Sequence, residues 1–101
     1  KLLGAMYKDY IAVSGGWQPL RGRDVHDAIQ MHRSQRLFWP LDARPDEVHV
    51  EDVAFSLARQ NRFIGQTDNP YNIAWHSVAL SNVVPDHLKK WALIHDASEA
   101  Y

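Results

Sequence analysis

Residues 72–101 read NIAWHSVALSNVVPDHLKKWALIHDASEAY, and this stretch decides the fold of the C-terminal part of the chain. His76 and His95 are nineteen residues apart (95 − 76), and Pro85 lies almost midway between them. If the stretch forms two helices that turn back at Pro85, each histidine lies roughly 14 Å along its helix from the turn, at ~1.5 Å per residue. We therefore expect the two imidazoles to face each other at the same height.

Two acidic side chains accompany the second histidine. Asp96 is adjacent to His95, and Glu99 follows one helical turn later on the same face as His95. Imidazole and carboxylate ligands without thiolates suit a divalent ion such as Mn, Co, Fe, Mg or Zn. The pattern predicts a metal site formed by His76, His95 and Asp96. Glu99 would stand beside it and assist proton transfer to or from a bound water or leaving group.

A histidine–aspartate dipeptide alone is a weak signal, and the chain contains a second one at His26-Asp27. That pair stands among polar residues, where a solvated surface accounts for it. His95-Asp96 instead follows an apolar run, so the pair needs a partner, an ion or water. A structural core histidine bonded to a neighbouring carboxylate stays open as an alternative, as does an exposed Glu99 without a catalytic role.

The bulk composition excludes several classes of protein. The chain has 101 residues, enough for one small domain, with 46% hydrophobic residues and a net charge of -1. This charge favours neither nucleic acid nor an anionic membrane as a partner. The absence of cysteine excludes disulfides and thiolate zinc sites and suits the cytoplasm. No apolar run approaches the ~18 residues that a membrane span requires. We expect a cytoplasmic protein.

The pattern of local signals predicts helices in the second half of the chain. Asn72 is a suitable N-cap for the helix that carries His76. Residues 1–36 have the weakest pattern, with a hinge or turn predicted at Ser14-Gly15-Gly16 and apolar spacing that permits a short helix over residues 24–31. The final helical pattern is still running where the sequence stops, so we interpret the chain as a fragment. The predicted helices cover residues 50–60, 72–84 and 86–101, with a loop at 61–71.

The spacing of His76, His95-Asp96 and Glu99 resembles the H…HDxxE pattern of the HD-superfamily metal-dependent phosphohydrolases. The likeness covers about residues 34–101 and is closest to the bacterial and phage branch near the 5′-deoxynucleotidases. It implies an all-α fold, an HD-domain-like helical bundle that is truncated here before the last metal-ligand helix. Residues 1–36 would then be an N-terminal segment of unclear structure, and residues 37–101 the N-terminal part of the HD-type domain. The further segments that carry the likeness, in order, are residues 38–42, 50–54, 61–63 and 71–78.

The resemblance also implies the roles of the residues. His76, His95 and Asp96 would be metal ligands and Glu99 the catalytic acid or base, while the family's further Asp ligand would lie beyond this chain. Arg62-Phe63 matches an arginine–aromatic pair that contacts substrate in the deoxynucleotidases, and an arginine suits a phosphate group. Trp75 departs from the family, whose members often carry an acidic or amide residue there. The orientation of His76 is therefore open, because ligating imidazoles usually have an acceptor behind them.

These observations predict an enzyme, a metal-dependent phosphohydrolase that most resembles a nucleotide phosphomonoesterase of the 5′-nucleotidase type. Its partner would be a small-molecule nucleotide substrate, with no nucleic acid and no membrane. Two alternatives stay open: a catalytically inactive HD-fold nucleotide sensor or regulatory module, and a helical interaction module that takes up no metal. Exposed apolar surface on a truncated domain would favour a homo-oligomer.

Overall fold

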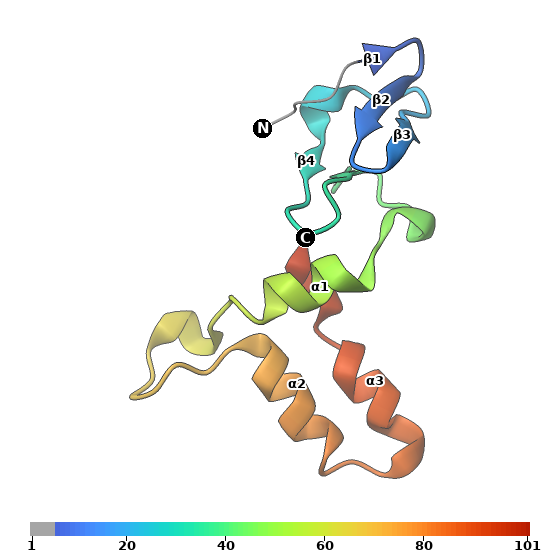
Figure 1. Ribbon diagram of the computed structural model, residues 1–101. Helices are drawn as coiled ribbons and strands as arrows, with labels where there is room; N and C mark the ends of the chain where they lie inside the picture. The colour runs from blue at the N-terminus through green and yellow to red at the C-terminus, as the bar shows by residue number, and fades with distance from the viewer. Residues whose placement is uncertain (1–5) are drawn as a thin grey trace. The chain divides into compact units, whose positions relative to one another are not determined.

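The computed structural model describes residues 6–101. The chain divides after Asp52 into two compact units. This division falls later than the boundary expected after residue 36, because Leu37 and Trp39 belong to the buried core of the first unit. The helices α2 and α3 both lie in the second unit (Figure 1).

The first unit contains a three-stranded antiparallel sheet in the order β1 (Met6–Tyr7), β2 (Tyr10–Val13) and β3 (Gly16–Pro19). β2 and β3 form a hairpin in which Val13 pairs with Gly16, so its loop consists of Ser14 and Gly15. Gly15 has a φ of 86°, a conformation that glycine adopts without steric cost. The turn predicted at this position is confirmed.

A second antiparallel pair, β4 (Ile29–Gln30) and β5 (Leu37–Phe38), completes the strands of the first unit. The buried Gln18 joins its own sheet to β5, since its side-chain amide donates to Leu37 O and its carbonyl accepts from Leu37 N, both at 2.8 Å. The core around this link consists of Ile11, Leu20, Val25, Leu37 and Trp39. The all-α prediction is wrong for this unit, and the chain is mixed α and β.

Helices form the second unit, as predicted, but they are shorter than expected. The stretch predicted as one helix over residues 86–101 is three elements: 3-10 turns over Asp86–Leu88 and Ala97–Ala100, with an α-helix over Lys89–Ile94 between them. The second break occurs where the backbone leaves the helical region at Asp96 (φ -104°, ψ 16°). α2 and α3 pack against each other as a hairpin on either side of Pro85 (Figure 1). The helices are α1 (Val50–Leu57), which crosses the division between the units, α2 (Ile73–Ser81) and α3 (Lys89–Ile94), with 3-10 turns η3 (Arg62–Gly65), η4 (Asp86–Leu88) and η5 (Ala97–Ala100).

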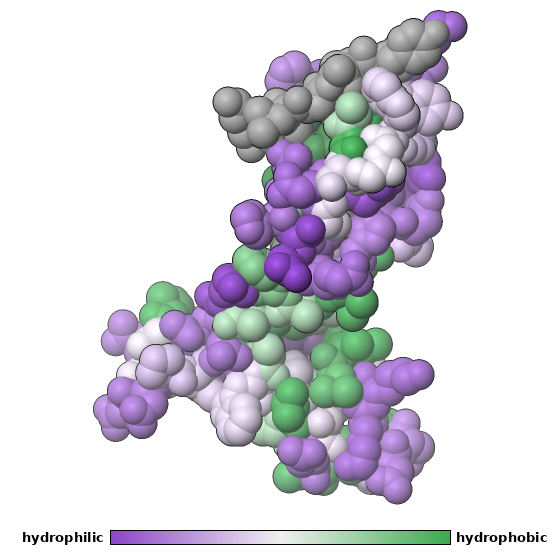
Figure 2. Space-filling model, in the orientation of Figure 1, coloured by the Kyte–Doolittle hydropathy of each residue, from purple (hydrophilic) through white to green (hydrophobic). Residues whose placement is uncertain are grey.

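The second unit leaves large apolar side chains at its surface, where hydrophobic residues are visible in Figure 2. On α3 only Ala92 is fully buried, whereas the Trp91 side chain is 58% exposed. Among the described residues, none of the helices has the length and apolar character that a membrane span would need. The exposed apolar residues of α2, α3 and the turn between them include Trp75, Val78, Val83, Leu88, Trp91, Leu93 and Ile94.

Candidate metal centre

The first turn of α2 positions His76. Asn72 caps the helix, as predicted, because its side-chain oxygen accepts a hydrogen bond of 2.7 Å from the backbone N–H of Trp75. His76 N donates to Asn72 O at 3.1 Å and so forms the first helical hydrogen bond. The side chain of Trp75 is 60% exposed. The cap therefore fixes where the helix begins and where His76 lies along it.

The end of α3 positions the other two residues of the cluster. α3 ends at Ile94, with His95 as its C-cap and Asp96 just beyond the helical geometry. The hairpin about Pro85 brings the rings of His76 and His95 to 5.3 Å between centroids. The predicted convergence of the two histidines is present in the structure, although Asp96 reaches the cluster from a bend and not from a continuous helix.

The donor atoms of His76, His95 and Asp96 all lie within 4.8 Å of one another. Asp96 Oδ2 is 3.0 Å from His95 Nε2 and 3.7 Å from His76 Nε2. Two ligand atoms that each lie ~2 Å from a tetrahedral zinc ion are about 3.3 Å apart, so the observed separations bracket that spacing. The three side chains are 17–27% exposed, so they are partly shielded from solvent. The donor set and spacing fit a divalent ion.

Hydrogen-bond geometry fixes the proton on one nitrogen of the His95 ring. Nδ1 lies 2.7 Å from the carbonyl oxygen of Ala92, which can only accept, so Nδ1 carries a proton. In the neutral imidazole Nε2 then presents a lone pair to Asp96 Oδ2 at 3.0 Å, where two acceptors repel each other. A proton on Nε2, giving an imidazolium–carboxylate ion pair, removes this conflict, and so does a cation held by both atoms. His95 is therefore already oriented as an Nε2 ligand.

Arg62 lies beside His76 because a short backbone pairing closes the loop between them. Asn61 and Asn72 form an antiparallel bridge, in which Arg62 N donates to Tyr71 O at 2.7 Å. The Arg62 Nη1 atom is 3.1 Å from His76 Nδ1. Burial lowers the pKa of the His76 imidazole below its ordinary value, and the positive charge of Arg62 lowers this pKa further. The lowered pKa favours the neutral imidazole, which is the form that binds metal ions.

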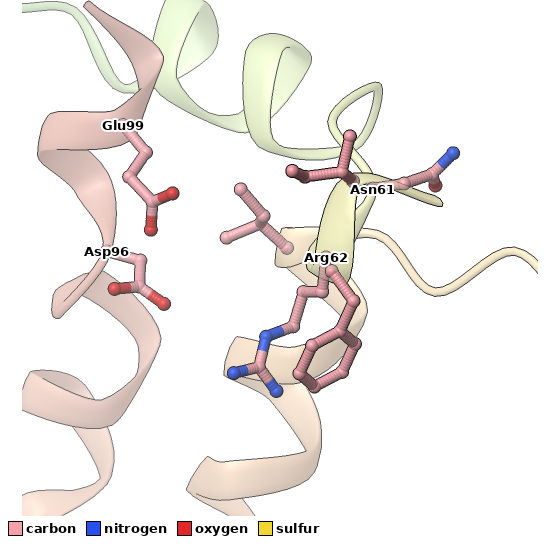
Figure 3. A pocket seen from close by; sticks show the side chains of 7 residues that line it. Asn61, Arg62, Asp96 and Glu99 are labelled. Carbon is pink, nitrogen blue, oxygen red and sulfur yellow. The ribbon is translucent and has the colours of Figure 1, made fainter. Parts of the chain in front are cut away.

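A cavity of about 340 Å³ adjoins the cluster and is open to solvent. Figure 3 shows Asp96 and Glu99 extending from one wall, Arg62 from the opposite wall, and the amide of Asn61 pointing away from the cavity. One wall is therefore acidic and the other carries a guanidinium group. The lining residues are Asn61, Arg62, Phe63, Ile64, Ile73, Asp96 and Glu99.

Strained backbone forms part of the wall that carries Arg62. Phe63 (φ 57°) and Ile64 (φ 55°) adopt the left-handed conformation, followed by Gly65 (φ 74°). This conformation is costly for residues with a Cβ atom, and above all for a β-branched residue such as Ile64. Ile64 and Phe63 are 94% and 59% exposed. Arg62 stacks on the Phe63 ring, with 4.7 Å from the guanidinium carbon to the ring centroid.

Sequence reasoning missed several residues that support the site. Gln60 Nε2 donates to the backbone oxygen of Glu99 at 2.7 Å and so holds the turn that carries this carboxylate. Trp91 stacks on His95 with 5.4 Å between ring centroids, and Tyr71 packs edge-on against His76 at 6.3 Å. The contact of Trp91 with His95 could have been predicted from the sequence, because residues four apart on a helix lie next to each other. The contact of Gln60 joins distant residues and has no such signal.

The His26-Asp27 dipeptide lies at the surface of the first unit, as expected. The His26 side chain is 83% exposed, and its Nδ1 is 2.8 Å from a carboxylate oxygen of Asp24. Asp27 is also exposed. Of the two dipeptides, only His95-Asp96 belongs to a cluster of side chains whose spacing could hold a metal ion, among the described residues.

Comparison with known proteins identifies relatives but no family. Over 56 residues the chain is 41% identical to the uncharacterized protein YfdR of Escherichia coli (strain K12), which covers 55% of the chain and 32% of that protein. An uncharacterized protein of Rhodobacter capsulatus is 37% identical over 68 residues, covering 58% of the chain and 35% of that protein. No family model and no solved structure matches the chain. The chain thus spans about a third of the length of these relatives.

Proposed function

We propose that the second unit is the metal-binding part of an HD-superfamily phosphohydrolase, and that the enzyme removes phosphate from a nucleoside monophosphate. The observation that carries the proposal is the convergence of His76, His95 and Asp96 at a spacing that suits one divalent ion. The HD-like helical bundle belongs to the same proposal. It is supported by the order of the motifs along the sequence and by the α2–α3 hairpin that presents them.

The residues around the cavity suit the steps of phosphate ester hydrolysis. His76, His95 and Asp96 would hold the ion, which supplies Lewis acidity for attack of water on phosphorus when it is bound. Arg62 projects into the cavity from the opposite wall, where its guanidinium group would bind the phosphate oxygens. Glu99 lies beside Asp96 but outside the ligand cluster, so its carboxylate is free to accept or deliver a proton.

The pocket also offers a surface for an aromatic base. Phe63 is exposed next to Arg62, which places an aromatic ring within reach of the group attached to a bound phosphate. Stacking of a base on an aromatic side chain contributes about 1–3 kcal/mol in proteins that bind single-stranded nucleic acid. This arrangement favours a nucleotide over a phosphorylated sugar or inorganic pyrophosphate as the substrate.

Phosphate release from ribo- and deoxynucleoside 5′-monophosphates, with Mn²⁺ or Co²⁺ present, tests the proposal. We expect release from at least one monophosphate and a loss of more than about a hundredfold in Asp96→Asn, because the bound ion provides several kcal/mol of transition-state stabilisation. Asp27→Asn is the matched control, since it alters the same dipeptide at an exposed position of the first unit and should leave the rate unchanged.

Other outcomes of this assay separate the alternatives. Hydrolysis of only triphosphates, cyclic dinucleotides or alarmone-type pyrophosphates would contradict the proposed monophosphatase activity. The broader proposal of a phosphohydrolase would stand. Equal rates in the Asp96→Asn and Asp27→Asn variants would remove Asp96 from the reaction. A protein that binds metal but hydrolyses none of these compounds would contradict the enzymatic function.

One observation favours a nucleotide sensor as the second candidate. Ligating imidazoles usually donate their second N–H to an acceptor, whereas Nδ1 of His76 faces the guanidinium group of Arg62, which is a donor. A site in which His76 does not bind metal would retain a nucleotide pocket without turnover. Tight binding of a nucleoside monophosphate, without phosphate release and without metal uptake, is the result that this candidate predicts.

A further inference from the structure

The two histidines of the cluster are held in opposite tautomers by their neighbours. At His95 the Ala92 carbonyl requires the proton on Nδ1, which leaves Nε2 free as a ligand atom. At His76 the neighbour of Nδ1 is an arginine nitrogen at 3.1 Å, and a guanidinium group has no acceptor. Nδ1 of His76 must therefore be the acceptor, and the single proton of the neutral ring lies on Nε2.

This tautomer is incompatible with ligation of an ion through Nε2 of His76. Its Nε2 points toward Asp96 Oδ2, 3.7 Å away, and is the atom nearest the other ligands, but it carries a proton there. Ligation through Nε2 moves that proton to Nδ1 by exchange with solvent, so that Nδ1 changes from acceptor to donor. Ligation through Nδ1 would replace Arg62 directly. Either route breaks the bond between Arg62 and His76.

We propose that Arg62 is a positioning residue for metal uptake, which holds His76 in the Nε2–H tautomer in the metal-free protein and is released into the cavity when the ion binds. The inference rests on the proposed metal site and adds to it a competition, because His76 can hold either Arg62 or an ion but not both at once. The released guanidinium group is then available for an anionic group in the cavity.

The surroundings of Arg62 fit a side chain with two positions. Its backbone is fixed by the hydrogen bond from Arg62 N to Tyr71 O, so only the side chain needs to move. The guanidinium carbon lies 4.7 Å from the Phe63 ring centroid and 5.8 Å from that of Tyr71, and such contacts tolerate sliding. Arg62 also lines the cavity opposite Glu99 and Asp96. Movement away from His76 therefore leads into a space that already holds opposite charge.

Histidine tautomers can be read directly from long-range ¹⁵N–¹H correlation spectra of the labelled chain, recorded near neutral pH with and without Zn²⁺. In the metal-free protein we expect His76 as the Nε2–H tautomer. With Zn²⁺ we expect His76 to lose the Nε2 proton and its ring nitrogen shifts to change together with those of His95. Zinc is diamagnetic and suits imidazole and carboxylate ligands.

Two variants test the role of Arg62. Arg62→Met keeps an unbranched side chain but removes the guanidinium donors, and should shift the His76 tautomer in the metal-free protein and tighten zinc binding about tenfold, as expected for loss of a competing charged hydrogen bond. Arg59→Met is the control, because Arg59 stacks on Phe55 at 3.6 Å and donates to Phe55 O. The Arg59→Met variant also removes one positive charge from the second unit, and we expect it to leave the His76 tautomer unchanged.

The outcomes distinguish this inference from the proposed function. If the metal-free wild type contains His76 as the Nδ1–H tautomer, or if Arg62→Met changes neither tautomer nor zinc affinity, the role of Arg62 is overturned and the metal site stands. If zinc alters neither histidine in any of the three proteins, the inference falls together with the metal site.

Discussion

At the scale of single residues, the protonation of the two histidines sets what the cluster can do. Backbone geometry makes His95 ready to bind an ion through Nε2, while the side chain of Arg62 opposes the same role in His76. Asp96 Oδ2 lies near both rings and is the atom that joins them into one site. We therefore expect that breaking the Arg62–His76 hydrogen bond completes the proposed set of three protein ligands.

Glu99 tests whether the acidic wall of the cavity takes part in the chemistry. Glu99→Gln keeps the shape of the side chain and its backbone contact with Gln60, but it removes the carboxylate. We expect kcat for monophosphate hydrolysis to fall by about 10²–10⁴-fold, as for loss of a general acid or base, while metal content stays the same. Activity assays and elemental analysis of the same preparation measure both quantities. A loss of metal equal to that in Asp96→Asn would make Glu99 a ligand.

At the scale of secondary structure, the N-cap of α2 determines where His76 lies. Asn72→Ala removes the hydrogen bond to Trp75 N and should lower the free energy of unfolding by about 1 kcal/mol. Asn82→Ala, at the exposed C-terminal end of the same helix, is the matched control. This variant should change the free energy of unfolding by less than about 0.5 kcal/mol. Denaturant unfolding followed by circular dichroism gives both values, and equal losses would show that the cap has no special role.

The helical hairpin could be predicted from the sequence because its signals are local. Pro85 interrupts the helical pattern, Asn72 is a cap, and equal distances from the turn place His76 opposite His95. The contact of Arg62 with His76 could not be predicted in the same way. It depends on a backbone bridge that closes a loop, and no periodic pattern encodes such a pairing.

The strands of the first unit were missed because they are short. β4 and β5 have two residues each, too few for an alternation of buried and exposed side chains to be visible. What stabilises them is the buried Gln18, which satisfies both backbone groups of Leu37. A polar residue in a core carries no hydrophobic signal, so the sequence pattern does not reveal this link. The helix predicted through residues 95–101 failed for a different reason, since Asp96 turns out of the helix toward His95.

At the scale of the whole molecule, the residues proposed for chemistry are confined to one of the two compact units. The first unit has its own core and a buried ion pair, in which Glu47 accepts from Arg23 at 2.7 and 2.6 Å while Arg23 stacks on Trp39. All six residues proposed for metal, catalysis and substrate lie in the second unit, between Arg62 and Glu99. The chain spans about a third of its relatives, so the activity and any association of the whole protein remain proposals.

The measurement that tests the central claim most directly is zinc uptake by equilibrium dialysis with elemental analysis, comparing the wild type with His95→Gln and His26→Gln. The account predicts about one ion per chain in the wild type and in His26→Gln, whose histidine is exposed. It predicts at least a tenfold weaker affinity in His95→Gln, which loses a ligand of the cluster. Absence of bound zinc in the wild type, or equal uptake by His95→Gln, would contradict the metal centre.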